Sequence, residues 1–145
     1  LFMKYLTSIE NNETLNNVAL LLSRIIVGFS MLSHGYPKLE KLLAGGEIQF
    51  FNFLGLGSEF TLILVIIAEF VASIFLILGL FTRPAAFLNL FTMIIASFVI
   101  HAGDAFADRE MSILYLIIFL LIFAFGPGSY SIDGMIEGRK NKSQW

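Results

Sequence analysis

The chain has 145 residues, a length typical of one domain, with a formal net charge of −2 and no cysteine. Hydrophobic residues make up 57% of it and charged residues only 14%, whereas an ordinary soluble domain carries about 25% charged residues. So little charge excludes a water-soluble globule of this size, and no basic block indicates nucleic-acid binding. Without cysteine, this chain has no disulfide, thiolate metal site or cysteine-bound iron–sulfur cluster.

After a polar lead-in over residues 1–17, four long apolar segments follow. They cover residues 18–36, 60–81, 84–103 and 110–126. At about 1.5 Å rise per residue they reach roughly 25–33 Å, which matches a hydrocarbon core of about 30 Å. Because these segments show hardly any polar face, we expect an all-α fold. The predicted architecture is a four-helix antiparallel membrane bundle over residues 18–134.

Between the first and second spans lies a connection of a different kind. Pro37 predicts the end of the first helix, because proline lacks an amide N–H and clashes with the preceding turn. Residues 38–59 contain Phe50, Phe51 and Phe53, so they are too apolar for a free loop and too short for another span. We interpret them as a short interfacial or re-entrant element over one mouth of the bundle. A loop packed on the helix ends is the equal alternative.

The distribution of lysine and arginine outside the spans predicts the orientation. With four spans, the N-terminus, the turn at 82–83 and the C-terminus share one side of the membrane. That side holds the larger number of basic residues, namely Lys4, Arg83, Arg139, Lys140 and Lys142. We therefore place both termini in the cytoplasm and treat residues 135–145 as a basic cytoplasmic tail.

Two charged residues interrupt the apolar spans, Arg24 in the first and Glu69 in the second. Arg24 lies roughly 9 Å and Glu69 roughly 18 Å from the cytoplasmic edge, by the rise of a helix. Each charge alone costs about 2.5–3.5 kcal/mol near the centre of a membrane helix, and pairing makes both tolerable. We predict an Arg24–Glu69 ion pair that either fixes helix packing or lines a ligand cavity. Arg24 reaching back to the interface is the third alternative.

A second polar group is expected near the outer mouth. His34 and His101 lie close to the outer ends of their spans, and Glu110 opens the fourth span on the same side. Together they predict a polar-ligand or proton-relay site. No HxxxH or ExxH spacing is present, so we assign no metal site. The alternative is that the histidines face water or bond to loop carbonyls.

The order of these features is similar to that of one protein family. Arg24 is followed by HGYPKL at 34–39, Glu69-Phe70, LGLFTRPAA at 78–86, His101 and GPGSYSID at 126–133. This order resembles the DoxX family of small bacterial four-helix membrane proteins, over most of the chain. The resemblance implies a location in the bacterial cytoplasmic (inner) membrane. It also implies an intramembrane polar pocket lined by Arg24, His34, Glu69 and His101.

The resemblance further implies a link to redox chemistry, because the family takes its name from a subunit of a thiosulfate:quinone oxidoreductase. We expect an accessory subunit that binds a quinone or a similar hydrophobic molecule and works with a membrane-associated oxidoreductase. The chain shows no flavin or haem motif, so whether it catalyses a step itself stays open. One alternative is a structural or assembly subunit of a larger membrane complex. The other is a small proton-coupled transporter, which intramembrane ionisable groups would suit.

Overall fold

A computed structural model describes residues 2–9 and 11–143 of the protein. Residues 1 and 10 of the predicted lead-in and residues 144 and 145 of the predicted tail lie outside the described residues. The described residues form helices and connecting turns, which confirms the all-α prediction. In chain order the helices are α1 (Phe2–Thr7), α2 (Glu13–Ala44), the 3-10 turn η1 (Phe53–Gly55), α3 (Ser58–Ile66), the π-helix η2 (Ile67–Val71), α4 (Ala72–Leu78), α5 (Thr82–Ile95), the π-helix η3 (Ala96–Ile100), α6 (Phe106–Phe125) and α7 (Ile132–Lys142).

Three helical segments of the described chain are long and apolar enough to cross a membrane. They are Glu13–Ala44, Ser58–Leu78 and Thr82–Ile100. They contain most of the first three predicted spans. Helix α6 is also long, but Asp108, Arg109 and Glu110 lie near its start. Many large apolar side chains on these helices are exposed, as expected where lipid rather than water is the solvent.

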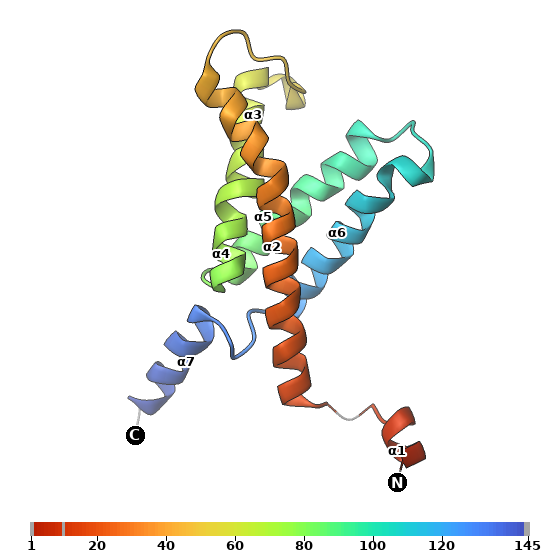
Figure 1. The fold of residues 1–145 in the computed structure, drawn as a ribbon, viewed down its shortest axis with the longest axis vertical. Helices are drawn as coiled ribbons and strands as arrows, with labels where there is room; N and C mark the ends of the chain where they lie inside the picture. The colour runs from red at the N-terminus through yellow and green to blue at the C-terminus, as the bar shows by residue number, and fades with distance from the viewer. Residues whose placement is uncertain (1, 10, 144–145) are drawn as a thin grey trace.

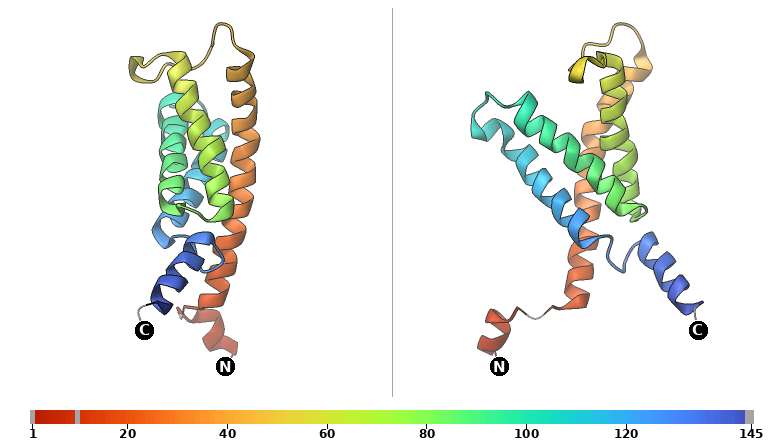
Figure 2. Two further views of the ribbon diagram at one scale, coloured as in Figure 1. Left: turned by 90° about the vertical axis from the view of Figure 1, so that its left-hand side faces the viewer. Right: turned by 180° about the vertical axis from the view of Figure 1, so that it is seen from behind.

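The long helices form two hairpins that diverge (Figures 1 and 2). Helix α2 packs along α3, η2 and α4, and helix α5 packs along α6. The hairpins are close where α4 turns into α5, and they separate toward the opposite end, where α2 ends and α6 begins (Figure 1). A core of apolar side chains that includes Met31, Leu76, Phe119 and Ile122 holds them together. This divergence leaves room for cavities between the hairpins at that end.

Two glycines of α2 allow this helix to pack closely against the second span. A Cβ atom at Gly28 would lie 2.5 Å from Ile77 Cγ1, and one at Gly35 would lie 2.9 Å from the backbone of Glu69. Larger side chains at either position would push the two helices apart. The absence of a side chain at Gly35 therefore brings α2 directly against the π-helix that carries Glu69.

The predicted end of the first helix at Pro37 is wrong. Helix α2 continues through Pro37 to Ala44. Proline removes only one hydrogen bond of the helix, and Pro37 lies on an exposed face where its ring displaces no neighbouring helix. The extra turns bring Lys38 into the interior region between the hairpins, which the sequence interpretation had placed outside the span.

The connection after α2 packs on the helix ends. Residues 45–57 are mostly irregular, with η1 as their only helical turn. The Phe53 ring meets the Phe91 ring of α5 edge-on, with centroids 6.3 Å apart. The Phe53 amide donates to Thr61 Oγ1 at 3.1 Å. Residues 45–57 therefore form no re-entrant helix, and their contacts are those of the alternative interpretation, a loop packed on the helix ends.

Candidate functional site

Arg24 is completely buried at the end where the hairpins are close. Its Nη1 donates to the carbonyl oxygen of Leu76 at 3.3 Å, and its Nη2 donates to the carbonyl oxygen of Tyr130. The predicted Arg24–Glu69 ion pair is therefore wrong.

The physical reason is the position of carbonyl groups that can accept a further hydrogen bond, such as that of Leu76, which already accepts one from the Gly79 amide at 3.1 Å. The C-terminal turn of a helix carries carbonyl oxygens without intrahelical donors and the negative end of the helix dipole. Leu76 lies in that turn of α4, whereas Glu69 lies seven residues earlier, roughly 10 Å further along the helix axis. The guanidinium therefore binds the end of the helix instead of crossing to the carboxylate.

The segments at 78–86 and 126–133 meet around Arg24. Asp133 accepts hydrogen bonds from the amides of Phe81 at 3.0 Å and Thr82 at 2.9 Å, at the start of α5. The Asp133 amide donates to the carbonyl of Gly79 at 2.9 Å. A Cβ atom at Gly79, where φ is +67°, would lie 2.1 Å from Arg24 Nη1. These contacts fasten α2, α4, α5 and the start of α7 together, and Arg24 lines none of the cavities between the hairpins.

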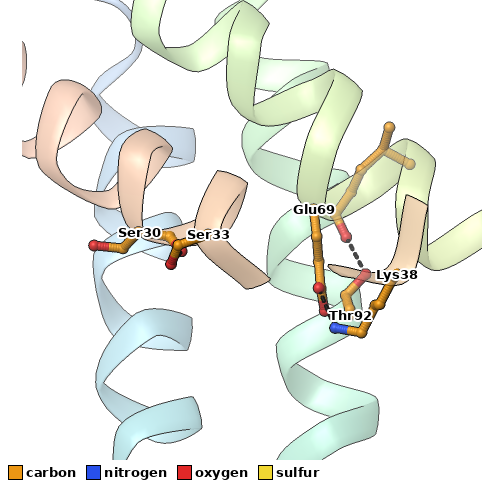
Figure 3. Close-up of polar contacts among 6 residues, drawn as sticks. Ser30, Ser33, Lys38, Glu69 and Thr92 are labelled. Atoms are coloured by element: carbon orange, nitrogen blue, oxygen red, sulfur yellow. Dashed lines mark hydrogen bonds and ion pairs between the residues drawn. The ribbon is translucent and has the colours of Figure 1, made fainter. Parts of the chain in front are cut away.

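The second buried charge, Glu69, forms an ion pair with Lys38 (Figure 3). Glu69 is 5% exposed and lies in the π-helix η2. Lys38 comes from α2, one turn after His34, and Figure 3 shows Thr92 of α5 beside the pair. Three different helical segments therefore converge at this point. Lys38 is a site residue that the sequence interpretation missed.

An apolar cavity of about 420 Å³ adjoins the ion pair. Lys38 and Glu69 are the only charged residues of the described chain that line it, and Thr61 and Thr92 add hydroxyl groups. The rest of the wall is aliphatic and aromatic, with Phe53 and Phe91 among its rings. A mostly apolar pocket with a few convergent polar groups is the usual form of a small-molecule site.

A smaller cavity, of about 190 Å³, lies on the other side of the same ion pair. It is lined by Lys38 and Glu69 again, and also by His34 of α2 and Asp108 of α6. His34 packs edge-on against the Tyr115 ring at 6.2 Å between centroids. His34 and Asp108 are both exposed, so this cavity has a polar mouth.

The structure does not bring His34, His101 and Glu110 to one site. His101 Nδ1 instead bonds Asp104 Oδ2 at 2.7 Å within the turn before α6. Glu110 is exposed and lines neither cavity. Over the described residues, no three histidine or acidic side chains are grouped to hold a metal ion. The polar groups that do meet are His34, Lys38, Glu69 and Asp108.

Both π-helices line the larger cavity. The π-helix η2 contributes Ile67, Ala68 and Glu69, and η3 contributes Ala96 and Ile100. A π-helix inserts one residue into the helical ladder and is frequent at functional sites. Its presence on both walls marks this cavity, rather than the Arg24 end, as the candidate site.

These features define a small helical membrane protein with a cavity and one ion pair between two hairpins. The DoxX family profile matches residues 19–102, more than half of the chain. The chain belongs to the DoxX family.

Among curated proteins, the chain is similar to two Escherichia coli (strain K12) proteins. It is 30% identical to the inner membrane protein YqjF over 86% of this chain and 97% of that protein. It is 30% identical to the inner membrane protein YphA over 80% of this chain and 89% of that protein. An uncharacterized protein of Haemophilus influenzae is 32% identical, over 76% of this chain and 84% of its own length. No solved structure matches the chain.

Proposed function

We propose that the protein binds a small, mostly apolar ring compound of the quinone class in the 420 Å³ cavity, as an accessory subunit of a membrane oxidoreductase. The single observation that carries this proposal is the composition of the cavity wall. It is apolar and aromatic except for one buried ion pair and two hydroxyl groups. A ring with one or two oxygen atoms and a hydrocarbon tail is likewise mostly apolar with one polar end, so it matches this wall.

The contacts follow from the chemistry of the lining side chains. Lys38 carries three N–H donors, so it can donate to a ligand oxygen while it remains beside Glu69. Phe53 and Phe91 offer ring faces and edges for an aromatic ligand. Arg24 takes no part, because its Nη1 and Nη2 donate to backbone carbonyls at the other end of the protein and it does not line this cavity.

We further propose that α6 is the fourth span, which completes an antiparallel four-helix arrangement in the inner membrane. Its first turn carries Asp108 and is followed by Arg109 and Glu110, but 15 mostly apolar residues remain up to Phe125. With α6 as a span, both termini lie on one side, and the basic end of α7 favours the cytoplasm. The cavities then lie toward the outer side of the membrane. The two similar E. coli proteins are named as inner membrane proteins.

A partner must supply the electrons in this proposal, since the chain holds no cysteine for an iron–sulfur cluster. This protein then binds and orients the quinone, and a membrane-associated oxidoreductase exchanges electrons with it. Its own contribution is a site in which the ring oxygen is fixed by Lys38.

Equilibrium binding of decylubiquinone to the purified protein in lipid nanodiscs tests the proposal. We expect saturable binding by the wild type and binding at least about tenfold weaker in Lys38→Met, because a hydrogen bond to a charged group contributes about 1.5–3 kcal/mol. Lys140→Met, on exposed α7, is the matched control and should bind like the wild type. A second variant, Thr92→Trp, places a large ring in the cavity and should weaken binding at least as much. If the wild type does not bind, or all four proteins bind equally, the proposed function is wrong.

A further inference from the structure

The Lys38–Glu69 ion pair is a wall shared by two cavities. On one side lies the apolar cavity of about 420 Å³ that takes the proposed ligand. On the other side lies the cavity of about 190 Å³, whose wall is also largely apolar but has His34 and Asp108 at its exposed mouth. Glu69 is thus buried, yet the smaller cavity connects it to polar side chains at the surface. A carboxylate in this position can exchange a proton with water on the side away from the ligand.

The surroundings of Glu69 contain few other groups that could take that proton. Helix α2 presents Lys38 and His34, and α6 presents Asp108 and Tyr115. From α5 and η3, Met93 and Ala96 face the smaller cavity, and neither side chain titrates. Lys38 donates to Glu69 Oε2. Within the described residues no side chain or backbone group donates to Oε1, which is left to contact a ligand.

The hydrogen-bonding capacity of a carboxyl group depends on its protonation. An ionised carboxylate only accepts hydrogen bonds, whereas the protonated acid also donates one. A quinone carbonyl oxygen only accepts, so it conflicts with ionised Glu69 and suits the protonated acid. A quinol hydroxyl donates, so it suits ionised Glu69. The protonation state of one side chain therefore discriminates between the oxidised and the reduced form of the ligand.

We propose, on the basis of the proposed function, that Glu69 is the specificity-determining residue of the site and couples ligand choice to a proton taken from the His34 side. Binding of the carbonyl form takes up a proton on Glu69, and binding of the hydroxyl form does not. The affinity for the carbonyl form then increases as the pH falls, whereas the affinity for the hydroxyl form does not depend on the pH, because its binding exchanges no proton. The two forms therefore respond differently to pH at the same site.

The test measures dissociation constants between pH 5 and pH 8 for decylubiquinone and for decylubiquinol kept reduced under anaerobic conditions. In the wild type, we expect the ratio of the two dissociation constants to change at least about tenfold across this range, since one linked proton changes an affinity by up to tenfold per pH unit. The amide of Glu69→Gln both donates and accepts, so this variant should bind both forms with a ratio independent of pH.

Two further variants identify which group carries the proton. His34→Gln and Asp108→Asn should keep the different pH responses of the two forms, because they leave Glu69 in place. If either variant abolishes the responses while Glu69→Gln keeps them, Glu69 is not the coupling group. If both ligand forms bind the wild type with the same pH response, or with none, the inference is overturned and the proposed function stands. If neither form binds at any pH, the proposed function itself fails.

Discussion

Arg24 and Glu69 are both buried charges within membrane helices, but their surroundings differ. Arg24 donates to the backbone carbonyls of Leu76 and Tyr130, in a tightly packed region where even a Cβ atom at Gly79 would not fit. Glu69 pairs with one flexible side chain, that of Lys38, and faces two cavities. The first arrangement fastens helices together, and the second leaves a charged group available to a ligand.

This contrast shows that burial of a charge in a membrane helix does not by itself indicate a binding site. What matters is whether the charge is bound by backbone groups, which cannot move away, or by a side chain beside empty space. Substitutions at the Arg24 end should therefore change stability with little effect on ligand affinity. Substitutions at the Lys38–Glu69 end should weaken ligand affinity with a smaller effect on stability.

Arg24→Met should give the largest loss of stability. It removes two charge-assisted hydrogen bonds and leaves the Leu76 and Tyr130 carbonyls with fewer donors in a dry interior, so we expect a loss of about 3 kcal/mol. Unfolding by dodecyl sulfate in mixed micelles measures it. Arg83→Met is the matched control, because Arg83 also donates to carbonyls, those of Phe123 and Ala124, but is exposed. Equal losses in the two variants would contradict the role given to burial.

Gly79→Ala should have the next largest effect. The residue has φ +67°, and the added Cβ atom would lie 2.1 Å from Arg24 Nη1 and 2.4 Å from Ser131 Cβ. Strain of this kind costs about 1–3 kcal/mol, measured by the same unfolding experiment. At Gly138 of helix α7 a Cβ atom would meet nothing within 4 Å. Gly138→Ala should therefore be neutral or slightly stabilising, and a comparable loss there would show that the Gly79 effect is not steric.

Hydropathy and segment length were sufficient to predict the three long apolar helices, although not the end of the first one, because a helix satisfies all backbone hydrogen bonds of a segment that lies in lipid. The partners of the charged residues could not be predicted in the same way. Depth along a helix says where Arg24 and Glu69 lie relative to the membrane, but not which way each side chain points. The groups that bind Arg24 are backbone carbonyls, which every residue carries. No residue type in the sequence therefore indicates which carbonyls will bind it.

Lys38 was missed for a specific reason. Pro37 predicts the end of the helix, and that prediction places Lys38 in the connection outside the span. A signal was nevertheless present, since Lys38 follows His34 by four residues, the spacing of side chains on one helical face. Gly35 lies between them, and its lack of a side chain lets the second span pack against this face of α2. A helix continued through Pro37 would have predicted the His34–Lys38 face of the site.

Lys38→Met should lower stability less than the two variants at the other end. It leaves the Glu69 carboxylate without its partner, but Glu69 also faces the smaller cavity, where water or a proton can relieve the charge, so we expect a loss of only about 1 kcal/mol. Replacing both members, in Lys38→Met with Glu69→Leu, should restore the stability because no unpaired charge remains. The double variant should still bind decylubiquinone at least about tenfold more weakly than the wild type. Recovery of binding together with stability would show that the pair has only a structural role.

Asp133→Asn should have the smallest effect, about 1 kcal/mol, typical of the loss of a helix cap. Asp133 accepts from the amides of Phe81 and Thr82 through two oxygens, whereas asparagine offers only one acceptor oxygen. The exchange of these two amides with deuterium should become faster, which mass spectrometry of the region around the start of α5 detects. Glu137→Gln, on the exposed part of α7, should leave it unchanged. Because the cap lies at the Arg24 end, ligand affinity in Asp133→Asn should equal that of the wild type; a weakened affinity would mean that the two ends of the protein are coupled rather than separate.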